Sequence, residues 1–198
     1  MPPAAKRSFP TLALALVPRA VALNLALGAV VAALKLPVFL DSVGTILVAA
    51  LVGPGAAVLT GIASNTVLGL LSSPVFFAFI PVTVVIGAIA GLAAKLGAFR
   101  SVWSALIAGA LLGIVSGAIS TLIVIALFGG LTASGTGLVT IALRAVGLPL
   151  WPAAAIASIG TDIIDKAISF VLVALVIARL PARIRTRFGG AHEAPVAA

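Results

Sequence analysis

The acidic residues of this chain stand where charge is costly. Only four of the 198 residues are acidic, and three of these, Asp41, Asp162 and Asp165, lie in or against long apolar stretches. Lys166 follows Asp165 directly. An ionised side chain inside a membrane costs about 3 kcal/mol or more, and such side chains usually serve binding or transport. The pattern therefore predicts a site for a polar ligand.

Five polar residues share one face of the last apolar stretch, because they are spaced three and four residues apart. They are Ser158, Asp162, Asp165, Lys166 and Ser169. A purely structural interpretation pairs Asp162 with Lys166, an acid four residues before a base. Asp165 would then need a proton, another partner such as Arg144, or a ligand. We favour the ligand, and predict that Asp162, Asp165 and Lys166 bind substrate.

Two further candidates lie earlier in the chain. Asp41 opens the second apolar stretch, where its carboxylate could contact substrate or cap the N-terminus of a helix. Asn65 lies inside the third apolar stretch, and a buried amide there either joins helices or donates to a ligand. We predict that both residues contribute to substrate binding.

The residues needed for several common chemistries are missing. The chain has no cysteine, and its one histidine, His192, lies in the C-terminal tail, so neither a thiolate or histidine-cluster metal site nor a Ser/His/Asp set can form. No lysine follows a glycine-rich phosphate-binding loop, which excludes ATP binding by that route. An intramembrane aspartyl pair of Asp162 and Asp165 would be unusual on a single helical turn. We therefore expect no enzymatic activity, catalytic residue, cofactor or metal.

The composition is that of a membrane protein. Hydrophobic residues make up 63% of the chain and charged residues 8%, and the mean hydropathy is +1.37. The net charge of +8 lies in loops and tails, so it predicts orientation in a lipid bilayer and no nucleic-acid partner. We expect a single transmembrane substrate-binding domain over residues 1–188 and a flexible cytoplasmic tail over residues 189–198.

Six apolar stretches are long enough, or nearly so, to cross a membrane as helices. They cover residues 19–34, 37–52, 56–71, 77–94, 102–128 and 152–178, with a lead-in at 11–17 that we expect to break at Pro18. With both termini inside, only Lys35 and Arg144 of the basic loop residues fall outside, as the positive-inside rule requires. The sequence thus predicts an all-α integral membrane protein, a bundle of six transmembrane helices with both termini cytoplasmic.

Some of these stretches leave alternatives open. Residues 37–52 and 56–71 are short and joined by the turn Gly53–Gly55, so they form either two tilted crossings or one re-entrant hairpin. We prefer two crossings, because a hairpin would move the basic tail outside. Residues 129–150 are rich in glycine and small polar residues, and we expect an outer loop with a short helix at 139–146 that acts as a lid.

Repeated glycines indicate close helix packing. Gly109, Gly113 and Gly117 recur at a spacing of four residues, as do Gly87 and Gly91 on the preceding stretch. Small residues on one face allow helix backbones to approach each other.

The chain also resembles a known family. The segment Leu40–Leu47, the turn Gly53–Gly55 with Asn65 after it, Pro81 before Gly87 and Gly91, and Asp165–Ser169 before Leu180–Arg183 resemble, in this order, the substrate-binding S components of energy-coupling factor (ECF) vitamin transporters. The resemblance covers roughly residues 20–188. It implies a six-helix subunit in the cytoplasmic membrane of a bacterium or archaeon that captures a vitamin or related micronutrient at an outward-facing pocket.

The resemblance also implies partners. Such a subunit works with a transmembrane T component and two ATP-binding subunits, which supply the energy for uptake. In the family, small residues on the first helix contact the T component, and here these positions are Ala22, Ala26, Ala29 and Ala33. The alternatives are a membrane sensor or scaffold, which predicts a signalling partner and no uptake, and a standalone secondary carrier, which predicts ion-coupled uptake without ATPases.

Overall fold

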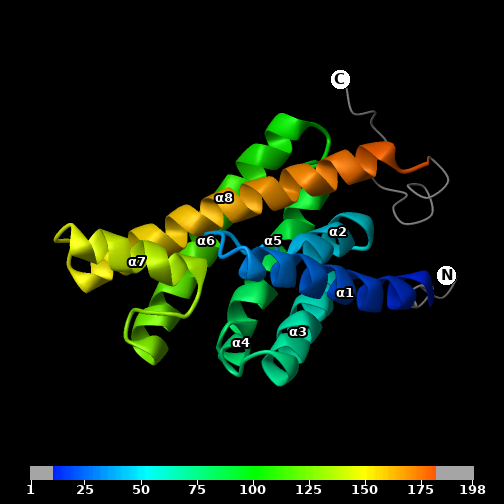
Figure 1. Cartoon of the computed structure of the whole chain (residues 1–198). Helices are drawn as coiled ribbons and strands as arrows, with labels where there is room; N and C mark the ends of the chain where they lie inside the picture. The colour runs from blue at the N-terminus through cyan, green and yellow to red at the C-terminus, as the bar shows by residue number, and fades with distance from the viewer. Residues whose placement is uncertain (1–10, 182–198) are drawn as a thin grey trace, which may run out of the picture.

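The computed structural model describes residues 11–181, with side chains from residue 15 onward, and contains only helices over this range. The helices are α1 (Thr11–Ala33), α2 (Val43–Leu51), α3 (Pro54–Leu71), α4 (Val75–Ala78), α5 (Ile80–Lys95), α6 (Val102–Phe128), α7 (Gly135–Ala145) and α8 (Leu150–Arg179) (Figure 1). The predicted tail at 189–198 lies outside the described residues.

The length and composition of single helices support the membrane character of the protein. Three helices of the described part are long and apolar enough to cross a bilayer: residues 15–33 of α1, α3 and α6. Large apolar side chains point outward along them, among them Leu70, Leu111 and Leu122. α8 is the longest helix, but Asp162, Asp165 and Lys166 interrupt its apolar sequence. Over residues 11–181 the protein is therefore all-helical and apolar enough for a membrane, and its buried charged residues, Asp162, Asp165 and Lys166, lie in α8.

Glycines set the closest helix contacts, as the sequence predicts. An added Cβ at Gly113 would lie 2.5 Å from the carbonyl oxygen of Asp162, so the backbones of α6 and α8 touch directly. Gly109 faces Lys166 and Gly117 faces Ile159, which makes the two helices antiparallel. Figure 1 shows α8 crossing α6 along this contact. α3 and α5 form a second antiparallel pair, in which Gly87 meets Val58 and Gly91 meets Pro54.

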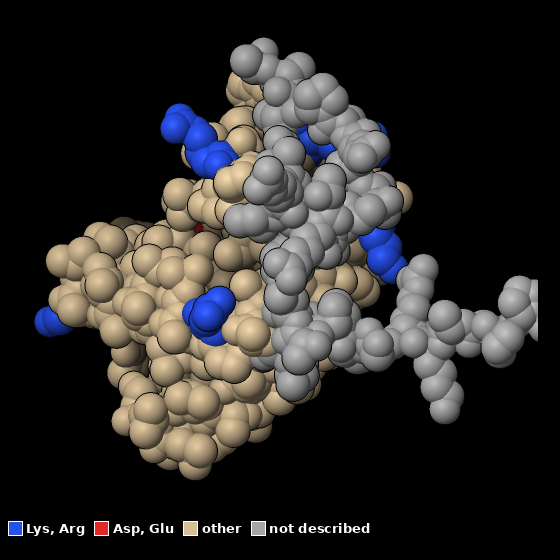
Figure 2. All heavy atoms as spheres, turned by 90° about the vertical axis from the view of Figure 1, so that its right-hand side faces the viewer, with Lys and Arg blue, Asp and Glu red and all other residues tan. Residues whose placement is uncertain are grey.

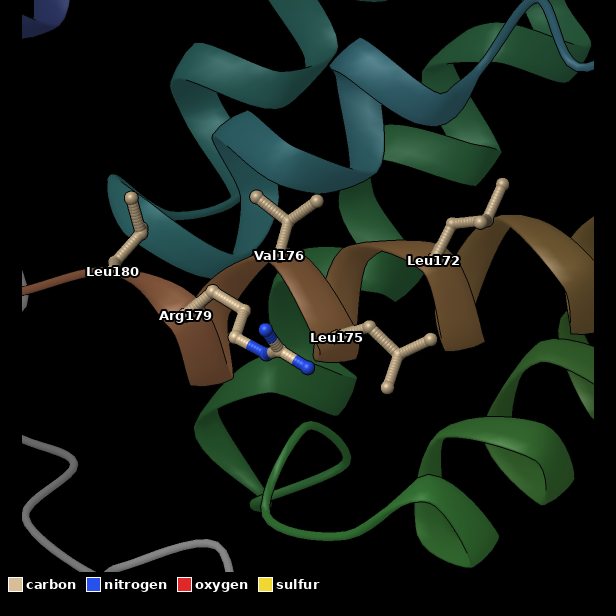
Figure 3. Close-up of a pocket in the computed structure, with 5 residues that line it drawn as sticks. All are labelled: Leu172, Leu175, Val176, Arg179 and Leu180. Carbon is tan, nitrogen blue, oxygen red and sulfur yellow. The ribbon is translucent and has the colours of Figure 1, made fainter.

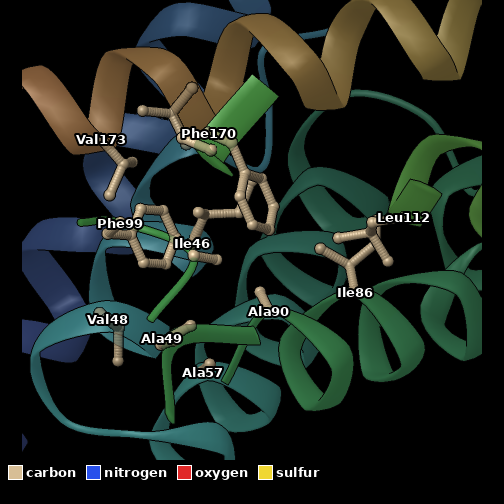
Figure 4. Packing of buried hydrophobic residues seen from close by; sticks show 14 of the residues in the cluster. Ile46, Val48, Ala49, Ala57, Ile86, Ala90, Phe99, Leu112, Phe170 and Val173 are labelled. Atoms are coloured by element: carbon tan, nitrogen blue, oxygen red, sulfur yellow. The ribbon is translucent and has the colours of Figure 1, made fainter. Parts of the chain in front are cut away.

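The hydrophobic core forms around α2. Ile46 and Val48 of this helix are fully buried, in one hydrophobic cluster with Ile86 of α5 and Phe170 of α8 (Figure 4). The rings of Phe99 and Phe170 stack with their centroids 5.0 Å apart. This core connects the two glycine-packed pairs to each other.

Three sequence-based boundaries differ from the structure. α1 continues through Pro18 without the expected break, since Pro18 is exposed and transmembrane helices tolerate a single missing N–H. The stretch 77–94 is divided, because α4 ends before α5 begins at Ile80. The short helix expected at 139–146 is confirmed as α7, which begins four residues earlier, at Gly135, and ends at Ala145.

The stretch 37–52 is only partly helical. α2 has nine residues and is therefore about 13 Å long, less than half of the hydrocarbon thickness. The preceding residues 34–42 are irregular and fold back along α1, so that Asp41 lies against Gly28, about one and a half turns before the end of that helix. Gly44 then lies against Ala20. Residues 34–51 thus run antiparallel to α1, first as irregular chain and then as helix.

Candidate functional site

Asp165 and Lys166 form a buried ion pair. Their side chains are 0% and 3% exposed in the folded chain, and Lys166 Nζ donates to Asp165 Oδ2. This pairing differs from both sequence-based alternatives. Lys166 does not pair with Asp162, and Arg144, on the exposed side of α7, does not pair with Asp165. Because a buried charge needs a close partner, the adjacent carboxylate neutralises Lys166.

The second oxygen of Asp165 holds the irregular segment at 34–42. Asp165 Oδ1 accepts hydrogen bonds from the backbone N–H groups of Phe39, at 2.9 Å, and Leu40, at 2.7 Å. Leu40 has a φ of 49°, a left-handed conformation that bulky residues rarely adopt. Strained backbone persists only where the surroundings hold it. Asp165 therefore fixes the shape of this segment as well as the charge of Lys166.

Asp41 and Asp162 complete the acidic cluster. Asp162 is 4% exposed, and Asp41 is partly buried where the irregular segment meets α2. Both carboxylates lie close enough to Lys166 and Asp165 to act on them electrostatically. Ser116 of α6 faces Asp162. Within residues 15–181, neither Asp41 nor Asp162 forms an ion pair.

The Asp41 side chain does not cap the N-terminus of α2. The residue at the N-terminal cap of α2 is Ser42, and no side-chain hydrogen bond caps this helix. The structure instead brings four of the five predicted site residues together: Asp41, Asp162, Asp165 and Lys166.

No family model, no curated protein and no solved structure matches this chain. The interpretation of the cluster therefore rests on its own geometry and on the sequence resemblance.

The fifth predicted residue, Asn65, has a different environment. It is buried, and its Nδ2 donates to the carbonyl oxygen of Phe76 at 3.2 Å, which ties α3 to the first turn of α4. The geometry favours the interhelical role for this amide. Its part in substrate binding stays a prediction.

Sequence reasoning missed Asn24. This fully buried amide donates through Nδ2 to Thr45 Oγ1 and Ser64 Oγ, both at 2.9 Å, and its Oδ1 accepts from the backbone N–H of Gly44 at 2.7 Å. The contact requires glycine at position 44, since an added Cβ would lie 2.2 Å from the Ala20 carbonyl oxygen. Asn24 therefore joins α1, α2 and α3. The sequence does single out Asn24, because it is the only polar residue between Arg19 and Leu34.

Two buried hydroxyl groups beside the cluster lack partners. Ser169 Oγ and Ser42 Oγ make no hydrogen bond within the described residues, although the two residues are 0% and 4% exposed. Ser169 lies in the middle of the helical arc that carries Asp162, Asp165 and Lys166. Ser42 directly follows Asp41. Buried polar atoms are nearly always hydrogen-bonded, so each of these hydroxyls is free for another molecule.

Two hollows on the surface are lined by residues outside the cluster. One is lined by Leu172, Leu175, Val176, Arg179 and Leu180 near the end of α8 (Figure 3). Another lies between α6 and α8 and is entirely apolar, with Leu106 and Ile164 among its lining residues. Their apolar walls suit lipid chains and offer almost no polar group to a small soluble molecule.

Proposed function

We propose that the protein is the substrate-capture subunit of an ECF-type transporter, which binds a vitamin or related micronutrient for ATP-driven uptake by partner subunits. The observation that carries the proposal is the interrupted segment at 34–42, whose backbone meets a buried polar cluster on α8. Irregular backbone at membrane depth is tolerated where it is buried in protein or lines a water-filled cavity. In transporters, such interruptions occur at the substrate site.

The arrangement of the ends supports the six-crossing topology. The irregular segment and α2 together make the second crossing, so that the chain crosses through α1, residues 34–51, α3, α5, α6 and α8. The start of α1 and the end of α8 then lie on one side (Figure 1). Figure 2 views the molecule from that side, where basic side chains project at several places and almost no acidic surface is visible. The positive-inside rule makes this side cytoplasmic.

The positions of the two tryptophans support the same placement of the helices in the membrane. Trp103 and Trp151 are 72% and 58% exposed, near the start of α6 and of α8. Gly113 of α6 lies opposite Asp162 of the antiparallel α8, so Trp151 lies level with residue 124 of α6. Trp103 is about 21 residues from that level, so the two indoles are ~31 Å apart along the helix axis. This matches the ~30 Å hydrocarbon thickness at whose boundaries tryptophan gathers. Asp162 falls midway between them.

We therefore predict shallow positions for both indoles in a bilayer. The variants Trp103→Phe and Trp151→Phe each leave one tryptophan, and the chain has no tyrosine, so emission reports a single site. In vesicles, lipids brominated near the headgroup should quench both variants more strongly than lipids brominated near the chain end. Stronger quenching by the deep bromines in either variant would contradict the proposed placement of the helices in the membrane.

The predicted partner face is open in the structure. Ala22, Ala26, Ala29 and Ala33 of α1 are all exposed, on the side of the helix away from the buried Asn24. Helices in lipid associate through close van der Waals contact, which small residues permit. This face is therefore available to a T component.

Ala26→Trp should reduce ATP-driven uptake to background while the isolated subunit still binds its substrate. The indole would fill the shallow groove along α1 without touching the cluster. Uptake in cells and binding to the purified protein measure the two effects, and Leu111→Trp on the exposed side of α6 is the control. If uptake survives Ala26→Trp, the interface lies elsewhere; if binding is lost, this face belongs to the bundle.

The proposal as a whole is tested by what the protein retains. Purified in mild detergent, it should release a stoichiometric small molecule, identified by mass spectrometry, and should co-purify with ATP-binding subunits from its own cells. A signalling partner without a bound molecule would favour a sensor. Ion-driven uptake by the subunit alone would favour a secondary carrier.

A further inference from the structure

The charges of the buried cluster do not balance. It contains three carboxylates and a single ammonium group, and Asp165 and Lys166 neutralise each other. Asp165 has no free oxygen, because Oδ1 accepts from Phe39 and Leu40 and Oδ2 accepts from Lys166. The ion pair therefore belongs to the fold, and an incoming ligand meets the other two carboxylates.

Asp41 and Asp162 approach this pair from different elements. Asp41 directly follows Leu40, whose N–H binds Asp165, and Asp162 lies one helical turn before Asp165 on α8, so both carboxylates lie around the same ion pair. Like charges close together in a poorly hydrated interior are costly. A positively charged group between them would remove that cost.

A separate observation points to a bound molecule at this place. The unpartnered hydroxyls belong to Ser169, on the helical face of α8 that carries Asp162 and Lys166, and to Ser42, the residue after Asp41. A hydroxyl accepts as well as donates, so both can orient an N–H or O–H group of a ligand. Within residues 15–181, neither hydroxyl has a hydrogen-bond partner that would account for its burial.

From these observations we propose that the substrate is an organic cation, whose positively charged group lies between Asp41 and Asp162 with Ser42 and Ser169 beside it. The inference rests on the proposed function and names its substrate class. An anionic substrate is disfavoured, because Lys166, the one cation of the buried cluster, is held by Asp165. Carboxylate substrates would meet two further negative charges.

A thermal-unfolding screen of the full chain tests the proposal. The probes are water-soluble vitamins, amino acids and polyamines, grouped by net charge at pH 7, in a buffer whose sodium concentration is constant. A ligand that binds only the folded state raises the melting temperature in proportion to its affinity. We expect the stabilising compounds to carry positive charge.

Two variants connect the effect to the site. Asp162→Asn should weaken binding of the stabilising compound at least tenfold, while the melting temperature of the ligand-free protein stays the same or rises, because an unpaired buried charge is removed. An Asp162 that serves only the fold would show the opposite, with a lower melting temperature. Glu193→Gln removes the fourth acidic residue, outside the described part, and is the control for the change in net charge.

The outcomes separate the two proposals. A neutral or anionic stabilising compound, or stabilisation by sodium chloride alone, overturns the organic cation and leaves substrate capture standing. Unchanged affinity in Asp162→Asn also overturns it. Absence of any stabilising compound, together with absence of a retained molecule, counts against substrate capture itself.

Discussion

Asp165→Asn is expected to lower the free energy of unfolding by up to about 3–5 kcal/mol, because it removes the carboxylate that contacts the buried Lys166 ammonium and leaves it only the acidic groups of Asp41 and Asp162. The amide keeps an oxygen that can accept from Phe39 and Leu40, so the change acts on the charge more than on the irregular segment. Thermal or denaturant unfolding in detergent micelles measures the effect. Loss of substrate binding in this variant would follow from loss of folding and would not by itself assign Asp165 to the pocket.

A double-mutant cycle separates the ion pair from other roles of Asp165. Lys166→Met alone should also destabilise, since it leaves the Asp165 carboxylate unpaired. The double variant Asp165→Asn/Lys166→Met should be more stable than the sum of the single effects predicts, because neither charge remains. Additive effects would mean that the two side chains do not depend on each other and would contradict the pairing.

Gly113→Ala is expected to destabilise the protein by roughly 2–3 kcal/mol, at the upper end of the usual effect of overpacking. The added Cβ would lie 2.5 Å from both the Asp162 carbonyl oxygen and the Ile163 Cα, and backbone atoms cannot move aside as a flexible side chain can. The variant should also weaken ligand binding, because separating α6 from α8 displaces Asp162.

Gly160→Ala is the matched control for this prediction. It makes the same change on α8, where an added Cβ meets nothing within 4 Å. Alanine favours helix over glycine by ~1 kcal/mol, so this variant should unfold at an equal or higher temperature. Equal destabilisation by the two substitutions would show that the loss does not come from the contact between α6 and α8.

Much of the architecture follows from local sequence patterns. Apolar length gives α3 and α6 within two residues, and the four-residue spacing of Gly109, Gly113 and Gly117 predicts a close helix contact that α8 supplies. The polar face of α8 follows from helical periodicity. These features depend on neighbours in sequence, and a single chain contains that information.

The remaining features depend on contacts between distant segments. The four-residue spacing on α8 favours an ion pair between Asp162 and Lys166. In the structure Lys166 pairs with Asp165 instead, and the other oxygen of Asp165 binds the distant irregular segment at 34–42. Hydropathy alone describes 37–52 as one apolar stretch and does not reveal that Asn24 holds Gly44 and Thr45 against α1. A partner more than twenty residues away has no signature in the local pattern.

The direct backbone contacts within the helix pairs make the stiffness of this molecule uneven. At Gly113 the backbone of α6 meets that of α8, and at Gly91 the backbone of α5 meets that of α3, so no side chain at these points can change rotamer to let the helices shift. Residues 34–42 deform more easily, because their strained turn at Leu40 is held to α8 by one carboxylate oxygen. Release of two hydrogen bonds there would open a path to the buried charges without bending any long helix.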